Sequence, residues 1–274
     1  MASAKTFLAS LFEALPFQKE KFKNKFVIFA SARTGSSALV QALRVHGGIQ
    51  CHGEVFTPGK WEKFSKESWN SCHVENVRNT RDLEFALNGL FGQYDGFKHL
   101  QEMFDLEKNK ALLTSFNLKV IFLWRKNALR RSISRSIAKQ SSVSHLWQVG
   151  REKYSNYSFE PIDIEELKQD TRHYKELVKI YKNILLASRV NFFEITYEDL
   201  FGKDISLAEK IALINQVFKF LGCSLVQGKE TLQKLGAVFD YQNKLNSEST
   251  YLKIPNIEAI RRELENNENG FLFG

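Results

Sequence analysis

The stretch that decides the fold is residues 25–39, which read KFVIFASARTGSSAL. Its first part, Lys25 to Ala30, is a short apolar and aromatic-rich run, which predicts a strand buried in a parallel sheet. The chain then passes through the small polar residues of Ser31 to Ser37 and enters a helical pattern at Ala38 to Val45. A strand, a small-residue loop and a helix in this order form a recurring anion cradle, because backbone N–H groups and the positive end of the helix dipole converge there.

Strand and helix patterns alternate over the rest of the chain. Further strands are predicted at Asp95 to Leu100, Leu118 to Trp124 and Val190 to Ile195. Helices are predicted at Asn127 to Lys139, Asp163 to Leu186, Leu207 to Leu221 and Asn256 to Asn266. Trp61 to Asn79 and Ser141 to Ile162 are polar and irregular, which indicates long loops. The fold class that follows is α/β, a P-loop-like three-layer fold with a mostly parallel central sheet flanked by helices.

The composition is that of a folded protein, because 43% of the 274 residues are hydrophobic and 26% are charged. We expect a single domain over 1–274, with an N-terminal helical extension at 1–24, a core at 25–200 and a C-terminal helical region at 201–274. No apolar run approaches the roughly 18 residues of a transmembrane helix. Met1 to Pro16 carries an amphipathic stripe, typical of a helix that packs on its own domain or on a partner chain.

Three cysteines occur, Cys51, Cys72 and Cys223, and they form no CxxC pair. An odd number without paired spacing argues against a disulfide scaffold and against a tetrahedral zinc site. The N-terminal stretch also lacks the long apolar core and the cleavage site of a secretory signal. We therefore expect a cytoplasmic protein in a reducing compartment.

Basic residues outnumber acidic ones by 39 to 31, which gives a formal net charge of +8. Six of the basic residues lie between Arg125 and Lys139, where no acid occurs. Such a run is typical of a site for nucleic acid or for an anionic small molecule, or of a solvated helix face. The total charge does not discriminate between these interpretations, so the position of the run in the fold decides.

The predicted loop has the residue types that a phosphate group requires. Gly35 permits unusual backbone angles, Ser36 and Ser37 offer hydroxyl donors, and Arg33 supplies a cation. The Walker A pattern GxxxxGK[ST] of nucleotide hydrolases is absent, since its nearest match, Gly222 to Glu230, has the wrong spacing and follows a helix.

A nucleotide hydrolase also needs a carboxylate at the end of a neighbouring strand to hold Mg²⁺. The predicted strand Leu118 to Trp124 is followed by Arg125, so a cation stands where that ligand would be. Glu194 does end a hydrophobic strand, and a displaced metal carboxylate stays open there.

Two motifs carry a resemblance to a known family. The stretch from Ser31 to Leu39 resembles the 5′-phosphosulfate loop of sulfotransferases that use 3′-phosphoadenosine 5′-phosphosulfate (PAPS), in the Arg-Thr-Gly-Ser-Ser form of bacterial and carbohydrate members. The stretch from Leu123 to Ser134 resembles their 3′-phosphate motif, a strand that ends in Arg followed by a helix that bears Ser. Ser134 comes nine positions after Arg125, a spacing similar to that of the trehalose and nodulation-factor type.

Three shorter stretches extend the resemblance. Gly53-Glu54-Val55-Phe56 is similar to the Gly-Glu-x-Phe of that subgroup, and Asp95-Gly96-Phe97-Lys98 is similar to its Gly-Phe-Lys strand. Ile195 to Leu200 resembles its Thr-Tyr-Glu-Asp-Leu strand end. The similar stretches span residues 25–200 in the family's order, and beyond residue 200 the resemblance is faint.

The resemblance implies roles for the residues that bind the donor. The loop residues Arg33, Thr34, Gly35, Ser36 and Ser37 would hold the 5′-phosphosulfate end, and Arg33 would also stabilise the leaving group. Arg125 and Ser134 would bind the 3′-phosphate, because the guanidinium fork matches phosphate oxygens. A one-residue shift of the helix start would exchange faces, so Ser132 or Ser136 are alternatives to Ser134. No metal is required if arginine supplies the positive charge.

A hydroxyl acceptor loses its proton as it attacks sulfur, so a general base must lie within reach. By resemblance this base is Glu54. His52 is the second candidate, because in an extended segment it would face the same side as Glu54. Lys98 is expected either to contact the sulfuryl group or to cap a strand.

The expected activity is therefore the transfer of a sulfuryl group from PAPS to a hydroxyl of a carbohydrate, a glycolipid or a small molecule, with release of PAP. Trp61, Trp69 and Trp147 lie in the polar segments and would form a platform for a sugar or lipid headgroup, or pin a loop. We expect no nucleic acid partner, and the sequence is compatible with a homodimer. The alternatives are a kinase-like ATP-dependent enzyme and a basic domain that binds nucleic acid through the helix from Arg125 to Lys139.

Overall fold

The computed structural model describes residues 24–56, 77–143, 156–239 and 248–273. Within these ranges, one parallel sheet has the strand order β2-β3-β1-β4-β5. Its strands are β1 (Phe26–Ala30), β2 (Cys51–Glu54), β3 (Gly96–Leu100), β4 (Lys119–Trp124) and β5 (Phe192–Thr196). The central position of β1 confirms that the KFVIFA run is a buried strand, and the α/β fold class is confirmed with it.

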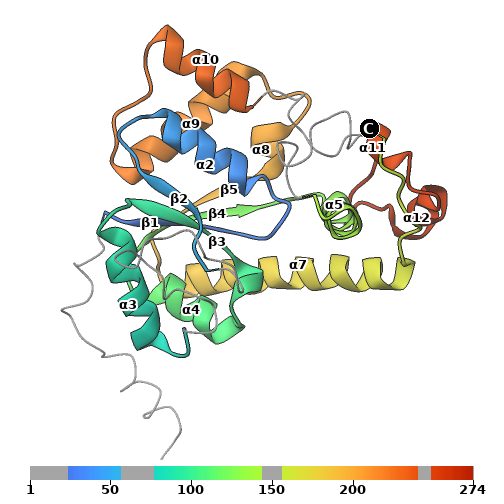
Figure 1. The fold of residues 1–274 in the computed structure, drawn as a ribbon, viewed down its shortest axis with the longest axis horizontal. Coiled ribbons are helices and arrows are strands. Elements are labelled where there is room, and N and C mark those ends of the chain that lie inside the picture. Colours follow the sequence, from blue (N-terminus) through green and yellow to red (C-terminus); the bar gives the residue numbers. More distant parts are fainter. Residues whose placement is uncertain (1–23, 57–76, 144–155, 240–247, 274) are drawn as a thin grey trace, which may run out of the picture.

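The side chains of each strand alternate between two apolar layers. Val27 and Phe29 of β1 pack in the layer that contains α3 (Thr80–Phe91), α4 (Leu106–Thr114) and α7 (Ile164–Ala187). Phe26 and Ile28 pack in the opposite layer, with α2 (Ser36–Val45), α8 (Tyr197–Phe201), α9 (Leu207–Leu221) and α10 (Lys229–Val238). Figure 1 shows these two groups of helices on either side of the sheet.

A third apolar cluster lies beyond one end of the sheet. It joins α5 (Ala128–Ser141) to α11 (Glu248–Tyr251) and α12 (Ile257–Leu264), and it includes Leu167 of α7. Figure 1 shows α5, α11 and α12 together beside the N-terminal end of α7. The C-terminal helices therefore pack on the helix that follows β4.

Most of the predicted elements are confirmed with end shifts of one or two residues. The predicted strand Val190 to Ile195 is β5, and the predicted helix Asp163 to Leu186 is α7, which Asp163 caps by accepting a hydrogen bond from the Glu166 N–H. The stretch after Ile195 was predicted as a strand end, but from Tyr197 it forms α8, because Thr196 and Asp199 make a capping box.

Besides α8, several elements were not predicted, namely β2, α3, α4, α10 and α11, and the short 3₁₀ helix η2 (Gln101–Met103). The predicted N-terminal extension and the three tryptophans Trp61, Trp69 and Trp147 lie outside the described residues. None of the helices in the described ranges combines the length and the apolar character needed to cross a lipid bilayer.

His99 of β3 is a buried polar group in the layer of α3, α4 and α7. Its Nε2 lies 2.8 Å from Oδ1 of Asn109, and its ring lies among those of Phe29, Phe56 and Phe104. Asn109 in turn donates hydrogen bonds to the carbonyl oxygens of Gln101 and Phe104. Burial lowers the pKa of His99 from 6.5 to about 4, so the ring is neutral in the folded protein at neutral pH.

The pKa of His99 predicts acid sensitivity. Below pH 6.5 the unfolded chain protonates this histidine while the folded protein does not, so stability falls as the pH falls toward 4. We expect the protonation of His99 in the unfolded chain to lower the free energy of unfolding by about 2 kcal/mol between about pH 7.5 and pH 5. Urea unfolding at both pH values measures this loss.

The matched variants are His99→Gln and His173→Gln, since His173 is exposed on α7. His99→Gln should show a smaller loss of stability on acidification than the unmodified protein, whereas His173→Gln should not differ from it. An unchanged pH dependence in His99→Gln would contradict the prediction.

Candidate site at the carboxyl edge of the sheet

The loop from Ser31 to Ser37 follows the carboxyl end of the central strand β1. Arg33 and Gly35 both adopt the left-handed backbone conformation, with φ of 70° and 81°. Left-handed residues in such loops turn N–H groups toward a common concave side that suits an anion. Gly35 is also the N-cap residue of α2 and has no side chain to bond the first-turn N–H groups. The N-terminus of α2 therefore keeps its capacity to bind an anion.

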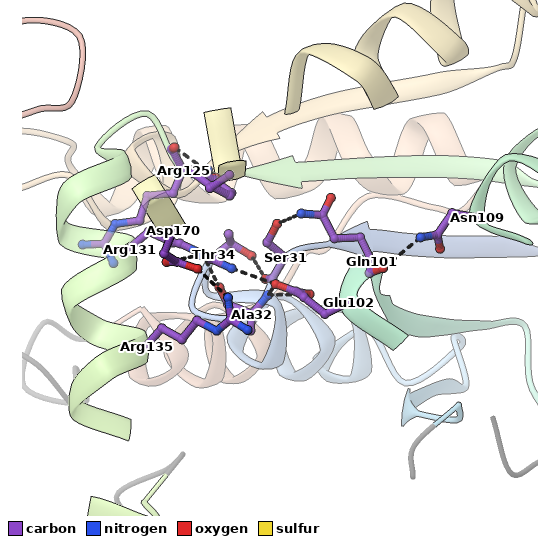
Figure 2. Close-up of polar contacts among 11 residues, drawn as sticks. Ser31, Ala32, Thr34, Gln101, Glu102, Asn109, Arg125, Arg131, Arg135 and Asp170 are labelled. Carbon is purple, nitrogen blue, oxygen red and sulfur yellow. Dashed lines mark hydrogen bonds and ion pairs between the residues drawn. The ribbon is translucent and has the colours of Figure 1, made fainter. Parts of the chain in front are cut away.

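The hydroxyl of Thr34 is used within the loop. Thr34 is fully buried, and its Oγ1 donates a hydrogen bond to the Ser31 carbonyl oxygen at 2.7 Å. The Ser31 hydroxyl in turn accepts a hydrogen bond from the Gln101 side chain, as Figure 2 shows. The side chain of Thr34 thus holds the loop together, and only its backbone is suited to contact a ligand.

Arg33 and Ser134 join the two predicted phosphate motifs. The Arg33 Nε donates a hydrogen bond to the Ser134 Oγ at 3.0 Å, although the two residues are 101 positions apart in the sequence. Ser134 lies on α5 and is buried. This contact favours Ser134 over the alternatives Ser132 and Ser136.

Arg125 stands directly after β4 and is only 7% exposed. Its Nη1 donates to the Arg33 carbonyl oxygen at 3.5 Å, and its guanidinium lies 4.1 Å from the ring centre of Tyr197. Burial opposes the charged form, but the electrostatic fields of Tyr197, Tyr251 and Glu198 outweigh it and leave the pKa of Arg125 raised. Arg125 is a permanent cation beside the loop.

The Nε of Arg125 is buried and has no hydrogen-bond partner within the described residues. The Glu198 carboxylate lies 4.0 Å from it, which is too far for a hydrogen bond. Glu198 instead accepts hydrogen bonds from the N–H groups of Lys126 and Asn127 at 2.8 and 3.0 Å. Buried polar atoms are rarely left unsatisfied. The Nε is therefore an unused donor that an anionic ligand could occupy.

Lys98 connects the loop to Glu54. It is 4% exposed on β3, and its Nζ lies 2.6 Å from the Glu54 Oε1 and 3.0 Å from the Ser37 Oγ. The Glu54 side chain is 34% exposed and stands at the end of β2. Lys98 thus bridges the two residues that the sequence assigned to the donor and to the acceptor.

His52 does not share a face with Glu54. The register pairs His52 with Phe97 and Glu54 with Lys98, and the shift between them marks a β-bulge. Because Phe97 and Lys98 are adjacent in β3, their side chains point to opposite faces of the sheet. His52 packs edge-on against Tyr94, with the ring centres 4.8 Å apart, and burial lowers its pKa. The prediction that His52 and Glu54 face the same side is wrong, because the bulge interrupts the alternation.

Glu194, which the sequence left open as a metal carboxylate, has other partners in β5. It accepts hydrogen bonds from the Trp124 indole N–H and from the Lys182 ammonium, each at 2.8 Å. Its contacts therefore identify a structural carboxylate between β4 and α7.

Sequence reasoning missed the carboxylates that partner the basic residues of α5. Arg131 contacts Glu102 and Asp170, Arg135 contacts Asp170, and Lys139 contacts Glu166. In the sequence Arg131 stands out only as part of a basic run, and no spacing relates it to either carboxylate. The run is therefore locally neutralised by acidic residues of η2 and α7, and it is not a uniformly basic face.

Comparison with known proteins finds a family match over the part of the chain that holds these residues. A family model described as "Sulfotransferase family" matches residues 26–225, which include the loop, β2 to β5 and α5. Among curated proteins, no match was found. The matched range extends beyond residue 200, where the sequence resemblance was faint.

The geometry around Gly35 predicts the effect of adding one carbon atom. A Cβ at Gly35 would lie 2.6 Å from Cε2 of Phe201 in α8, whereas a Cβ at Gly47 would meet no atom within 4 Å. Both glycines have positive φ. We expect Gly47→Ala to cost about 1–2 kcal/mol from backbone strain alone, and Gly35→Ala to cost about 1–3 kcal/mol more from the clash.

Urea unfolding of the two alanine variants measures this difference. Equal losses of stability would show that α8 does not constrain the loop.

Proposed function

Since the chain belongs to the sulfotransferase family, whose members are enzymes that transfer sulfuryl groups, we propose that PAPS is its donor and that PAP is released. The observation that carries the proposal is the hydrogen bond between Arg33 and Ser134. It brings the predicted 5′-phosphosulfate loop and the predicted 3′-phosphate motif to one place. A single nucleotide with anionic groups at both positions could therefore contact both motifs.

The unused donor of Arg125 supports the 3′-phosphate assignment. A phosphate oxygen next to Arg125 and Ser134 would satisfy the buried Nε, which has no hydrogen-bond partner within the described residues. The 5′ end of the donor would then lie along Arg33 to Ser37, where backbone N–H groups and the N-terminus of α2 stabilise negative charge.

The proposed reaction is an in-line displacement at sulfur. The acceptor hydroxyl gives its proton to a base, its oxygen forms the new S–O bond, and the S–O bond to the 5′-phosphate breaks. The electron pair of that bond stays on the phosphate of PAP. Arg33 and the loop N–H groups stabilise the charge that develops there, as in phosphoryl transfer. Arginine and backbone donors suffice for this charge, so the proposal invokes no metal ion.

Glu54 is the proposed base. It is partly exposed, and its Oε1 lies 2.6 Å from the Nζ of Lys98. The same Nζ contacts the hydroxyl of Ser37 in the proposed donor loop. A carboxylate at this position lies beside the sulfuryl end of a donor bound as proposed. His52, the other candidate, points to the opposite face of the sheet.

The acceptor is proposed from the resemblance to the Arg-Thr-Gly-Ser-Ser subgroup. A hydroxyl of a carbohydrate or glycolipid is the first candidate, and a small alcohol is the second. The free thiols of Cys51 and Cys223 fit the proposed cytoplasmic location.

Two rival functions meet specific obstacles in the site. A kinase-like enzyme would need a carboxylate where β4 ends, and the residue there is Arg125. A nucleic-acid-binding helix would need free cations, but Arg131, Arg135 and Lys139 of α5 each form ion pairs with carboxylates of this chain.

Calorimetric titration with PAP tests the donor site without knowledge of the acceptor. We expect Ser134→Ala to weaken PAP binding about 10-fold and Arg125→Ala about 100-fold, since each removes a hydrogen bond to a charged phosphate. Ser136→Ala on the same helix is the matched control and should bind PAP normally. ADP, which lacks the 3′-phosphate, should bind far more weakly than PAP. If PAP binds no better than ADP, the proposal of a PAPS donor is wrong.

Glu54→Gln tests the proposed base. We expect it to bind PAP within twofold of the unmodified protein, because Glu54 faces the acceptor. Transfer from radiolabelled PAPS to a panel of sugars and glycolipids should fall about 10²–10⁴-fold. His52→Gln is the matched control and should retain transfer. Loss of transfer in His52→Gln with retention in Glu54→Gln would reverse the assignment.

A further inference from the structure

A single ion pair between the buried Arg131 and the partly buried Glu102 holds Ala32, the residue that precedes Arg33, on both sides. The Ala32 N–H donates to both carboxylate oxygens of Glu102, at 3.1 and 3.2 Å. The Ala32 carbonyl oxygen accepts a hydrogen bond from the Arg131 Nε at 3.2 Å. Arg131 and Glu102 are themselves joined at 2.8 Å. Figure 2 shows Glu102 and Arg131 converging on Ala32 from different elements.

Arg131 is held on its other side as well. It is 2% exposed, its Nη1 donates to Asp170 of α7 at 2.8 Å, and its guanidinium lies 4.6 Å from the ring centre of Tyr174. Asp170 also accepts a hydrogen bond from Arg135 at 2.5 Å. Burial alone would raise the pKa of Asp170, but the charges of Arg131 and Arg135 lower it. The result is a set of four linked charges, two negative and two positive, carried by Glu102, Asp170, Arg131 and Arg135.

A largely desolvated ion pair of this kind adds little to stability, because the cost of removing the charges from water offsets their attraction. Its specific effect is geometric. Arg33, the next residue, is held in the left-handed conformation, which costs a non-glycine residue about 1–2 kcal/mol. Anchors on both peptide groups of Ala32 oppose the relaxation of this strain.

The charges of the set also matter for an anion. The Glu102 carboxylate that holds the Ala32 N–H would repel a phosphosulfate bound to the same loop. Arg131 neutralises it at contact distance, so Glu102 can fix the loop without opposing the ligand. The Ala32 N–H is used by Glu102, so it is not one of the donors that an anion in this loop would contact.

We propose that Glu102 and Arg131 are positioning residues for the 5′-phosphosulfate loop, which they set in its donor-binding conformation before the donor arrives. The inference rests on the proposed function, since it assigns the loop to the 5′ end of the donor. It adds two residues that do not touch the donor and that act through the Ala32 backbone. Glu102 comes from η2, outside both sequence motifs.

The test compares two probes, PAP and adenosine 3′-monophosphate. Both carry the 3′-phosphate, and only PAP has a 5′-phosphate for the loop. Calorimetry with Glu102→Ala should show PAP binding at least 10-fold weaker and adenosine 3′-monophosphate binding within twofold of the unmodified protein. Glu102→Gln keeps an oxygen that can accept the Ala32 N–H, so it should lose less PAP affinity than Glu102→Ala. Glu107→Ala, at an exposed residue of α4, should leave both affinities unchanged.

The outcomes separate the two proposals. Equal losses for both probes in Glu102→Ala would indicate general damage to the site and overturn the positioning role, as would an unchanged affinity for PAP. If Glu102→Ala does not fold, Glu102→Gln decides by the same comparison of the two probes. An unmodified protein that binds PAP no more tightly than adenosine 3′-monophosphate would overturn the assignment of the loop itself, and the positioning role with it.

Discussion

The parallel pairing of the strands is the constraint on which the site depends. In a parallel sheet every strand ends at the same edge, and the loops that follow the strands meet there. The loop after β1, Glu54 of β2, Lys98 of β3 and Arg125 after β4 are all brought to this edge. Contacts among them link residues that are 44 to 92 positions apart. The parallel order of the strands therefore brings the residues of the site together, although they come from separate parts of the chain.

Two buried arginines near this edge, Arg125 and Arg131, have different partners, and these partners indicate different roles. Arg131 is surrounded by carboxylates and contacts the loop backbone, so its charge is balanced within the protein. Arg125 packs against the ring of Tyr197, and its nearest carboxylate, Glu198, is bonded mainly to backbone N–H groups. A cation with an incompletely used guanidinium can bind an anionic ligand, whereas a fully paired one serves to hold structure.

Lys98 directly connects the loop after β1 with Glu54 at the end of β2. Its ammonium contacts the hydroxyl of Ser37 in the loop after β1 and the carboxylate of Glu54, which is proposed as the base. The position of the proposed base is thus fixed relative to the loop from Ser31 to Ser37 by a buried side chain on an interior strand. Reactions that depend on the alignment of two substrates benefit from such fixed geometry, because less orientational freedom is lost when they react.

The amino-acid sequence by itself determined the elements that depend on local patterns. The KFVIFA and LKVIFLW runs are buried strands, Asp163 caps its helix, and Gly222 ends α9 in the left-handed conformation, because each signal lies within a few neighbouring residues. The resemblance carried by the Arg-Thr-Gly-Ser-Ser loop and by the Arg125 to Ser134 segment led to the family that the comparison then showed.

The tertiary structure decided what depends on contacts between distant residues. The bulge in β2 separates His52 from Glu54 although ideal alternation would place them together, because the pairing with β3 sets the faces. The contact with Arg33 favours Ser134 over its neighbours, and η2 and α7 supply the carboxylates that bind Arg131. No spacing in the sequence encodes these partners, because the free energy that selects them arises only when β1, β3, α5 and α7 are packed against one another.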